Sequence, residues 1–238
     1  MCHDQAIMGF EGINQNLERK ELPPKTVAIF DFDGTIADSR DTVGNIINQL
    51  ADEYGYEKLN EEDILKYTSK KAQDFLREDL KLSWLKIPSF ATRLRAELNK
   101  KIKELQPIAG MVEAVKELKS RNYKLGIISS NSEENIRQFI VNNNIDVFDF
   151  VSSGSSLLGK ARNIKNVLKR EGLEAEDVVY VGDEIRDREA AKKAGIEVVI
   201  VSWGYNSKDS LEKNNDTILI DTPSQLLDLL PDLSHAQN

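Results

Sequence analysis

Residues 27–35 read VAIFDFDGT, and this stretch decides how the rest of the chain is interpreted. Its first four residues are apolar, as is typical of a buried strand in a parallel sheet. The apolar run ends at Asp31 and Asp33, followed by Gly34, which permits a turn, and Thr35, which adds a hydroxyl. Because ligand crevices of such sheets lie beyond the carboxyl ends of the strands, we expect both carboxylates at a site of chemistry. Two carboxylates this close repel each other unless a cation, a hydrogen-bond network or a shared proton holds them.

The composition is that of an ordinary acidic globular protein: 238 residues, 40% hydrophobic, 30% charged, with a formal net charge of −8. This length allows one substantial core and a smaller lobe. The negative charge argues against nucleic-acid and anionic-membrane partners, both of which need a basic face. The single cysteine, Cys2, excludes an internal disulfide and agrees with a reducing compartment. Residues 1–25 form a polar leader without the features of a secretory signal, and no apolar run could span a bilayer, so we expect a cytoplasmic protein of undetermined oligomeric state.

Strand and helix patterns are distributed unevenly along the chain. Residues 39–106 show three helical patterns and no convincing strand. After Pro107, strands and helices alternate. The predicted strands are 27–30, 123–129, 148–152, 178–183, 197–202 and 217–220, and the predicted helices between and after them are 110–120, 133–142, 158–171, 186–194 and 224–230. We therefore expect an α/β fold: a doubly wound, Rossmann-like parallel sheet built from residues 26–38 and 107–238, with residues 39–106 inserted as an all-helical cap.

Polar residues also follow two later strands. The strand at 123–129 ends at Ser129, next to Ser130 and Asn131, and the strand at 178–183 ends at Asp183. If these strands are neighbours of the first one, Asp31, Asp33, Ser129 and Asp183 converge on one edge of the sheet. Clustered carboxylates need positive charge, and Mg²⁺, which prefers oxygen ligands, suits them.

A carboxylate in such a crevice can act as a nucleophile toward a phosphorylated substrate, forming an acyl phosphate that water then hydrolyses. Asp31 is the candidate nucleophile. Asp33 is placed to protonate the leaving oxygen and then to activate the water. Ser129 and Lys160, the latter at the start of a predicted helix, are candidates for neutralising the transferred oxygens.

These residues resemble the haloacid dehalogenase-like superfamily of phosphohydrolases. The first family motif, D-x-D-G-T, stands here as DFDGT at 31–35, and the fourth, G-D-x-x-x-D, as GDEIRD at 182–187. The second motif, a strand that ends in Ser or Thr, is similar to Ser129, and the third, a lysine, to Lys160. All four occur in the family's order.

The resemblance implies Asp31 as nucleophile and metal ligand, Asp33 as acid/base and ligand through its backbone carbonyl, and Asp183 as a second carboxylate ligand. It implies that Asp187 supports either the metal or Lys160, which makes Asp31, Asp33, Asp183 and Asp187 the predicted Mg²⁺ site. The implied phosphate-binding groups are Gly34, Thr35, Ser129, Ser130, Asn131 and Lys160, with the choice between the two serines open. The helical insertion resembles the cap of phosphoglycolate phosphatases, so the implied substrate is a small phosphorylated metabolite, with phosphoglycolate first.

Several alternatives share parts of this pattern. Residues 154–160, GSSLLGK, match a nucleotide-binding phosphate loop, except that Ala161 stands where such a loop has a metal-binding Ser or Thr. Ala161 is also a departure from the family pattern, because many phosphoglycolate phosphatases carry Pro after this lysine. Asp33 favours phosphate over halide chemistry, because a dehalogenase needs no acid at this position. A phosphonatase would use a cap lysine such as Lys70 or Lys71. A phosphosugar mutase or other phosphotransferase shares the motifs, and a non-enzymatic phosphate-ligand-binding or regulatory protein would have lost one of them.

Two further segments are candidates for contact with the substrate. Residues 203–206, WGYN, follow a predicted strand and are placed to border the pocket. Residues 67–70, YTSK, occupy a polar gap between the cap helices and are placed to touch the leaving group.

Overall fold

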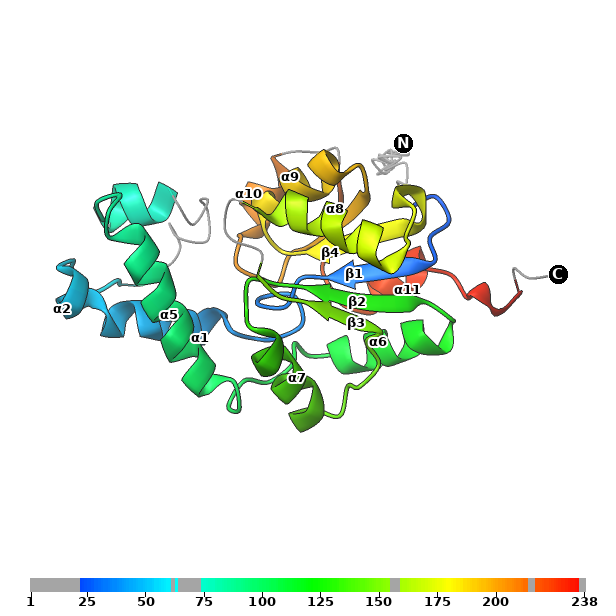
Figure 1. The fold of residues 1–238 in the computed structure, drawn as a ribbon, viewed down its shortest axis with the longest axis horizontal. Coiled ribbons are helices and arrows are strands. Elements are labelled where there is room, and N and C mark those ends of the chain that lie inside the picture. Colours follow the sequence, from blue (N-terminus) through cyan, green and yellow to red (C-terminus); the bar gives the residue numbers. More distant parts are fainter. Residues whose placement is uncertain (1–21, 61–62, 64–73, 155–158, 214–216, 236–238) are drawn as a thin grey trace, which may run out of the picture.

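The structure is a computed structural model that describes residues 22–60, 63, 74–154, 159–213 and 217–235. Its centre is a six-stranded sheet with the order β3-β2-β1-β4-β5-β6, in which every pairing is parallel (Figure 1). The strands are β1 (Val27–Phe30), β2 (Lys124–Ile128), β3 (Phe150–Ser152), β4 (Val178–Gly182), β5 (Glu197–Val201) and β6 (Ile218–Ile220). The predicted Rossmann-like sheet is confirmed.

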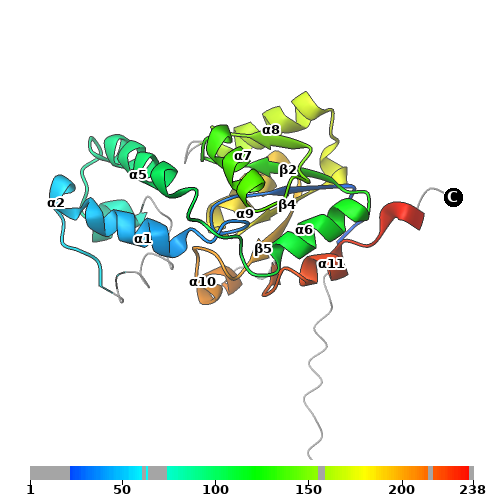
Figure 2. The same cartoon turned by 90° about the horizontal axis from the view of Figure 1, so that it is seen from below.

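Helices cover both faces of this sheet (Figures 1 and 2). One face carries α6 (Met111–Ser120), α7 (Glu133–Asn142) and α11 (Gln225–Leu229), and the other carries α8 (Lys160–Glu171), α9 (Ile185–Ala194) and α10 (Lys208–Glu212). The five predicted helices are confirmed within two residues at each end. The short α10 was not predicted, because five residues are too few to show a helical period.

Two hydrophobic clusters, one on each face of the sheet, explain why all four residues of β1 are apolar. Ala28 and Phe30 belong to the cluster shared with α6, α7 and the cap, whereas Val27 and Ile29 belong to the cluster shared with α8 and α9. All four are buried, since successive side chains of a strand point to opposite faces and both faces are covered here.

The chain between β1 and α6 forms a helical lobe beyond the carboxyl ends of the strands (Figures 1 and 2). Its described elements are α1 (Arg40–Gln49), α2 (Ala51–Tyr54), a π-helical turn (Phe75–Asp79) and α5 (Ile87–Lys101). The aromatic rings of Tyr54 and Phe90 meet edge to face at 5.1 Å, and the apolar side chains of the lobe continue the cluster below the sheet. The predicted fold class, a parallel sheet with an inserted helical cap, is confirmed.

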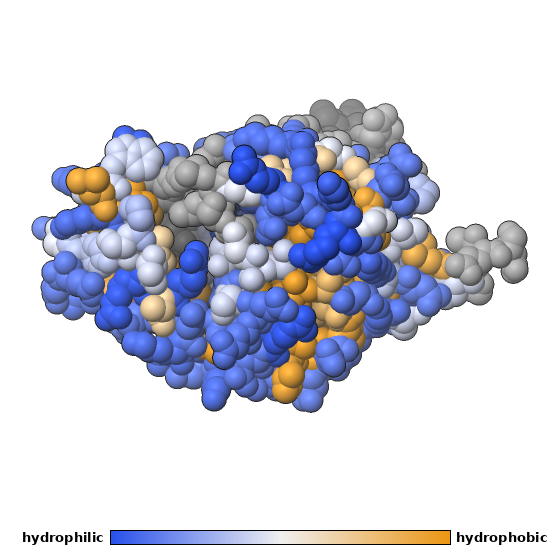
Figure 3. All heavy atoms as spheres, viewed as in Figure 1, coloured by the Kyte–Doolittle hydropathy of each residue, from blue (hydrophilic) through white to orange (hydrophobic). Residues whose placement is uncertain are grey.

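The surface agrees with the acidic, charge-rich composition. The face viewed in Figure 3 is mostly hydrophilic, with hydrophobic residues gathered near α6 and α7. No helix among the described residues is long and apolar enough to cross a membrane. Residues 1–21 of the predicted leader, including Cys2, and the candidate segment 67–70 with Lys71 lie outside the described residues.

Candidate active site

The strand order brings the predicted site residues to one edge. β1 lies between β2 and β4, and Phe30, the last residue of β1, pairs with Ile127 and Val181. Asp31, Ser129 and Asp183 therefore follow three adjacent strands at nearly the same level. All three are buried, at 3%, 1% and 0% exposure. Residues separated by up to 152 positions in the sequence thus share one crevice at the carboxyl edge, as parallel sheets generally arrange their sites.

Lys160, the first residue of α8, lies between two buried carboxylates. Its Nζ is 2.8 Å from Oδ2 of Asp31, and it also contacts Oδ1 of Asp187. Burial alone lowers the pKa of Lys160, but the charges of Asp187 and Asp31 raise it well above its ordinary value, so the ammonium stays protonated. Burial raises the pKa of Asp31, and Lys160 opposes that shift. The ammonium therefore favours the ionised form of Asp31, the form that can attack a phosphorus atom.

Asp187 also organises the backbone at the start of α9. Its Oδ2 accepts hydrogen bonds from the backbone N–H groups of Asp183 (3.1 Å) and Glu184 (3.0 Å), which forms part of a capping box. Gly182 allows this approach, because a Cβ at that position would lie 2.5 Å from Oδ2 of Asp187. Both oxygens of Asp187 are thus engaged within the protein, one by Lys160 and one by the backbone.

Asp183 is held from two sides. Its Oδ1 accepts a hydrogen bond from the hydroxyl of Thr35 (2.9 Å), and its Oδ2 accepts one from the backbone N–H of Tyr205 (2.7 Å). Burial and the neighbouring carboxylates raise the pKa of Asp183 well above its ordinary value. Gly34, with a φ of +78°, lies against it: a Cβ there would be 2.5 Å from Oδ2 of Asp183 and 2.5 Å from the Tyr205 ring. The turn after β1 therefore requires glycine for both its backbone conformation and its packing.

Asp33 points into the cavity with one oxygen unpaired. Its Oδ2 accepts a hydrogen bond from Nδ2 of Asn131 (3.3 Å), whereas its Oδ1 is buried and has no hydrogen-bond partner among the described residues. Burial and the charge of Asp31 raise the pKa of Asp33 to about 6, against which the Asn131 amide acts weakly. A carboxyl group in this state can exchange a proton near neutral pH.

The loop after β2 adds hydroxyl and amide groups to the same edge. Ser129 accepts a hydrogen bond at Oγ from the backbone N–H of Asn131 (3.0 Å), and its own hydroxyl proton has no acceptor among the described residues. Ser130 lines the cavity, as does Asn131. Both serines thus stand at the crevice, with Ser129 deeper and Ser130 at the wall.

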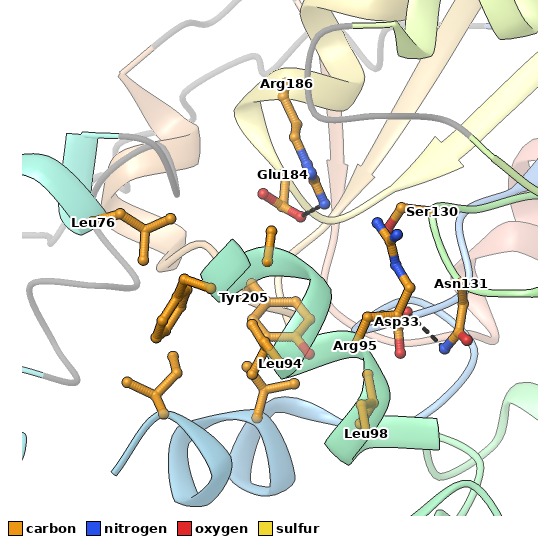
Figure 4. Close-up of a pocket in the computed structure, with 14 residues that line it drawn as sticks. Asp33, Leu76, Leu94, Arg95, Leu98, Ser130, Asn131, Glu184, Arg186 and Tyr205 are labelled. Carbon is orange, nitrogen blue, oxygen red and sulfur yellow. Dashed lines mark hydrogen bonds and ion pairs between the residues drawn. The ribbon is translucent and has the colours of Figure 1, made fainter. Parts of the chain in front are cut away.

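A cavity of about 150 Å³ opens between this edge and the helical lobe (Figure 4). The core contributes its polar wall, which is formed by Asp33, Ser130, Asn131, Glu184, Arg186 and Tyr205. The lobe contributes an apolar wall with one cation, namely Val43, Ile47, Leu76, Phe90, Ala91, Leu94, Leu98 and Arg95. Arg186 pairs with Glu184, whereas Arg95 has no hydrogen-bond or ion-pair partner among the described residues. A cavity of this kind can enclose a small molecule between the polar edge of the core and the helical lobe.

The charge balance of the edge fits a divalent cation. Ligand oxygens of Asp31, Asp183 and Asp187 all lie within 4.8 Å of one another, and all three residues are buried. Carboxylates outnumber cationic side chains among the described groups that meet here, which are Asp31, Asp33, Asp183, Glu184 and Asp187 against Lys160 and Arg186. An all-oxygen donor set of this kind suits Mg²⁺ better than a metal that prefers nitrogen or sulfur ligands.

Comparison with known proteins agrees with this arrangement. A family model for haloacid dehalogenase-like hydrolases matches residues 28–201. The chain belongs to this family. A phosphoglycolate phosphatase of Synechococcus elongatus is 35% identical over 206 residues, covering 86% of this chain and 97% of that protein. A pyrophosphatase PpaX of Bacillus cereus is 23% identical and covers 87% and 97%.

A solved haloacid dehalogenase-like protein of Streptococcus pneumoniae shares the fold, with a TM-score of 0.72 at 24% identity over 86% of this chain and 97% of that one. The predicted haloacid dehalogenase-like enzyme is therefore confirmed at the level of the family. Membership in this hydrolase family also makes the phosphate-loop interpretation of residues 154–160 unnecessary; of these, 155–158 lie outside the described residues.

Sequence reasoning missed several residues that line the site. Tyr205 was expected at the pocket border as part of 203–206, and it lies there. Glu184 and Arg186 occupy the variable positions of the fourth motif, so only their place inside that motif signalled them. Arg95 stands on a helix of the lobe among other charged residues, where no local pattern distinguishes it.

Proposed function

We propose that this enzyme is a magnesium-dependent phosphatase that hydrolyses a small phosphomonoester through an aspartyl-phosphate on Asp31. The observation that supports this proposal most strongly is the buried contact of 2.8 Å between the Asp31 carboxylate and the Lys160 ammonium. Asp33 follows Asp31 by two residues, and burial raises its pKa to about 6. A carboxylate whose ionised form is favoured by an adjacent ammonium, beside a second carboxyl that can carry a proton, is the pair that nucleophilic attack with acid–base assistance requires.

The reaction follows in two balanced steps. A carboxylate oxygen of Asp31 forms a bond to phosphorus as the bond to the leaving oxygen breaks, and the Asp33 carboxyl donates its proton to that oxygen. The ionised Asp33 then takes a proton from water, whose oxygen attacks phosphorus as the bond to Asp31 breaks. The products are the alcohol and inorganic phosphate, and both aspartates return to their initial states.

Four side chains are proposed to hold the transferred oxygens in place. Lys160 offers a positive charge, and the hydroxyls of Ser129 and Ser130 and the amide of Asn131 offer hydrogen bonds. Fixed donors of this kind stabilise charge that develops in the transition state. The backbone N–H groups of Gly34 and Thr35, which were predicted to bind phosphate, instead donate within their own turn, to the carbonyls of Ala37 (2.9 Å) and Phe32 (3.3 Å).

Asp31, Asp183 and the backbone carbonyl of Asp33 are the proposed ligands of Mg²⁺, which would supply positive charge to the phosphoryl oxygens. Asp187 is proposed to orient Lys160 and the metal's waters, because both of its oxygens already have protein partners.

Arg95 supports an anionic leaving group. It is the cation of the lobe's wall of the cavity, and Figure 4 shows its side chain extending from α5 toward the core. Without a carboxylate partner among the described residues, its guanidinium is available to a carboxylate or phosphate of the substrate. Phosphoglycolate, whose leaving group carries a carboxylate, is therefore the first substrate that we propose. Pyrophosphate, whose leaving group is itself an anionic phosphate, is the second.

We propose residues 39–106 as a cap that admits the substrate and excludes water when it closes on the core. The apolar side chains Leu94 and Leu98 on α5 would cover the cavity.

A phosphosugar mutase would need to keep the phosphoryl group on Asp31 until a second hydroxyl accepts it. A binding protein would release no phosphate at all.

The test is release of inorganic phosphate from a panel that includes phosphoglycolate, pyrophosphate, sugar phosphates and an aryl phosphate, with Mg²⁺ present. We expect phosphoglycolate to give the highest kcat/KM, and Asp31→Asn to abolish release from every compound. Comparable release by Asp31→Asn would refute the nucleophile. Transfer of phosphate to a second sugar position, without net release, would assign the mutase reaction.

A further inference from the structure

A chain of three asparagines connects the helical lobe to Asp33. Asn131 donates from Nδ2 to Oδ2 of Asp33 (3.3 Å), and its Oδ1 accepts a hydrogen bond from Nδ2 of Asn135 (2.9 Å). The same Nδ2 of Asn135 also donates to Oδ1 of Asn99, a residue of α5. The path therefore leads from the lobe, through the first turn of α7, to the carboxyl group that handles the proton in the proposed reaction.

The direction of these bonds determines which end of the Asn131 amide faces Asp33. Oδ1 of Asn131 accepts two N–H groups, one from the backbone of Ser132 (2.9 Å) and one from Asn135. An amide with two donors at its oxygen end must present its NH₂ end to the opposite side, which here is Asp33. Asn131 and Asn135 are both buried, so water cannot easily replace the hydrogen bonds that their side-chain amides donate.

Asn99 belongs to the same face of α5 as Arg95, since the two residues are four positions apart and thus one helical turn away. The face that lines the leaving-group end of the cavity is therefore also the face that supports Asn135. A shift of α5 would alter both contacts together.

We propose that Asn135 is a positioning residue for the acid/base Asp33, and that Asn99 links it to the place of α5. This inference rests on the proposed function. Asn135 holds the Asn131 amide in the orientation that fixes the Asp33 carboxyl beside the leaving oxygen, and Asn99 holds Asn135 only while α5 lies against the core. Proton transfer to the leaving group is thereby most effective when the cap is in place.

The leaving group distinguishes this role from a merely structural one. An alkoxide such as that of glycolate needs a proton as it departs, whereas p-nitrophenolate leaves as a stable anion. A misplaced Asp33 should therefore slow the release of glycolate and leave the release of p-nitrophenolate nearly unchanged. A general loss of packing would slow both substrates alike.

The experiment measures leaving-group release in a single turnover with phosphoglycolate and with p-nitrophenyl phosphate, using Asn135→Leu and Asn99→Ala. We expect Asn135→Leu to slow release of glycolate about tenfold and of p-nitrophenolate less than twofold, with KM for phosphoglycolate within about twofold of the wild type. Asn99→Ala should show the same selectivity at about threefold, and adding it to Asn135→Leu should cause no further loss. Asn99 is only partly buried, so this variant tests the link even if Asn135→Leu folds poorly.

Asn143→Ala is the matched control and should leave both rates unchanged. Among the described residues, the Asn143 side chain bonds only to the carbonyl of Phe139, at the far end of α7 (2.9 Å). Equal losses for the two substrates, or no loss in either variant, would overturn the inference. Asp31→Asn, assayed in parallel, separates the two levels of argument: turnover by that variant refutes the proposed function itself, whereas an inactive Asp31→Asn beside unselective asparagine variants refutes only the role of Asn135.

Discussion

The ammonium of Lys160 lies 2.8 Å from Oδ2 of Asp31, and both side chains are buried at the carboxyl edge of the sheet. Lys160 also contacts Asp187, so two buried carboxylates share one buried cation. In the proposed reaction this arrangement links stability and catalysis, because the same charge that stabilises the buried Asp31 carboxylate prepares it for attack.

Lys160→Met is expected to impair both properties. Removing the ammonium leaves Asp31 and Asp187 buried without their shared partner, which typically costs about 3–5 kcal/mol. Loss of a charge aimed at the transferred oxygens should also lower kcat by about a hundredfold or more. Urea denaturation and phosphate release measure the two effects. Lys165→Met, on the same helix but exposed, is the control, and equal behaviour of the two variants would contradict the assigned role.

Gly34→Ala is expected to inactivate the enzyme by displacing Asp183. A Cβ at Gly34 would lie 2.5 Å from Oδ2 of Asp183, whereas a Cβ at Gly55 meets nothing within 4 Å, although the two glycines have φ of +78° and +77°. Each substitution should cost roughly 1–2 kcal/mol of backbone strain. The thermal unfolding temperature (Tm) should thus fall in both variants, while kcat/KM should fall only in Gly34→Ala. Full activity of Gly34→Ala would show that the turn tolerates a side chain.

Mg²⁺ is expected to stabilise the folded protein through Asp183. Saturation at 100 times Kd contributes about 2.7 kcal/mol, which corresponds to a rise in Tm of roughly 5–10 °C for a chain of this length. Asp183→Asn should remove most of this rise. It can keep both hydrogen bonds, because its oxygen can accept from the Tyr205 N–H and its NH₂ can donate to the Thr35 hydroxyl. Calorimetry with Mg²⁺ or with a chelator makes the comparison, and an undiminished rise in the variant would exclude Asp183 as a ligand.

Arg95→Ala is expected to weaken recognition of the leaving group without affecting the chemistry. The loss of a guanidinium–carboxylate contact at a partly solvated site should lower kcat/KM for phosphoglycolate about tenfold. For p-nitrophenyl phosphate, which has no anionic leaving group, the change should be under twofold. Arg93→Ala serves as the control, because Arg93 lies on α5 but pairs with Glu53 and Glu97. If both substrates respond equally to Arg95→Ala, the leaving group does not contact Arg95.

The convergence of the site residues on one edge of the sheet could be predicted from the sequence, because it depends on where the strands end. Asp31, Ser129 and Asp183 each follow an apolar run, and parallel strands bring their carboxyl ends together wherever they are adjacent. The single assumption was that these three strands are neighbours, and the strand order supports it.

The cavity wall and the asparagine chain could not be predicted in the same way. Arg95 and Asn99 approach the core only because α5 packs across the carboxyl edge, and no periodicity in the sequence encodes the distance between two helices. The Asn135 contacts likewise depend on amide orientations that only the assembled loop determines. Side chains that act across the boundary between two lobes leave a weak local signal.

The central claim is that Asp31 carries the phosphoryl group, and acid-quenched single turnover tests it most directly. The enzyme is mixed with Mg²⁺ and phosphoglycolate labelled in its phosphate, quenched in acid within the first turnover, and digested for peptide mapping. We predict that the label appears on the peptide that contains Asp31, is absent from Asp31→Asn, and disappears as inorganic phosphate forms. Wild-type turnover with no labelled peptide, or with the label on another residue, would contradict the account.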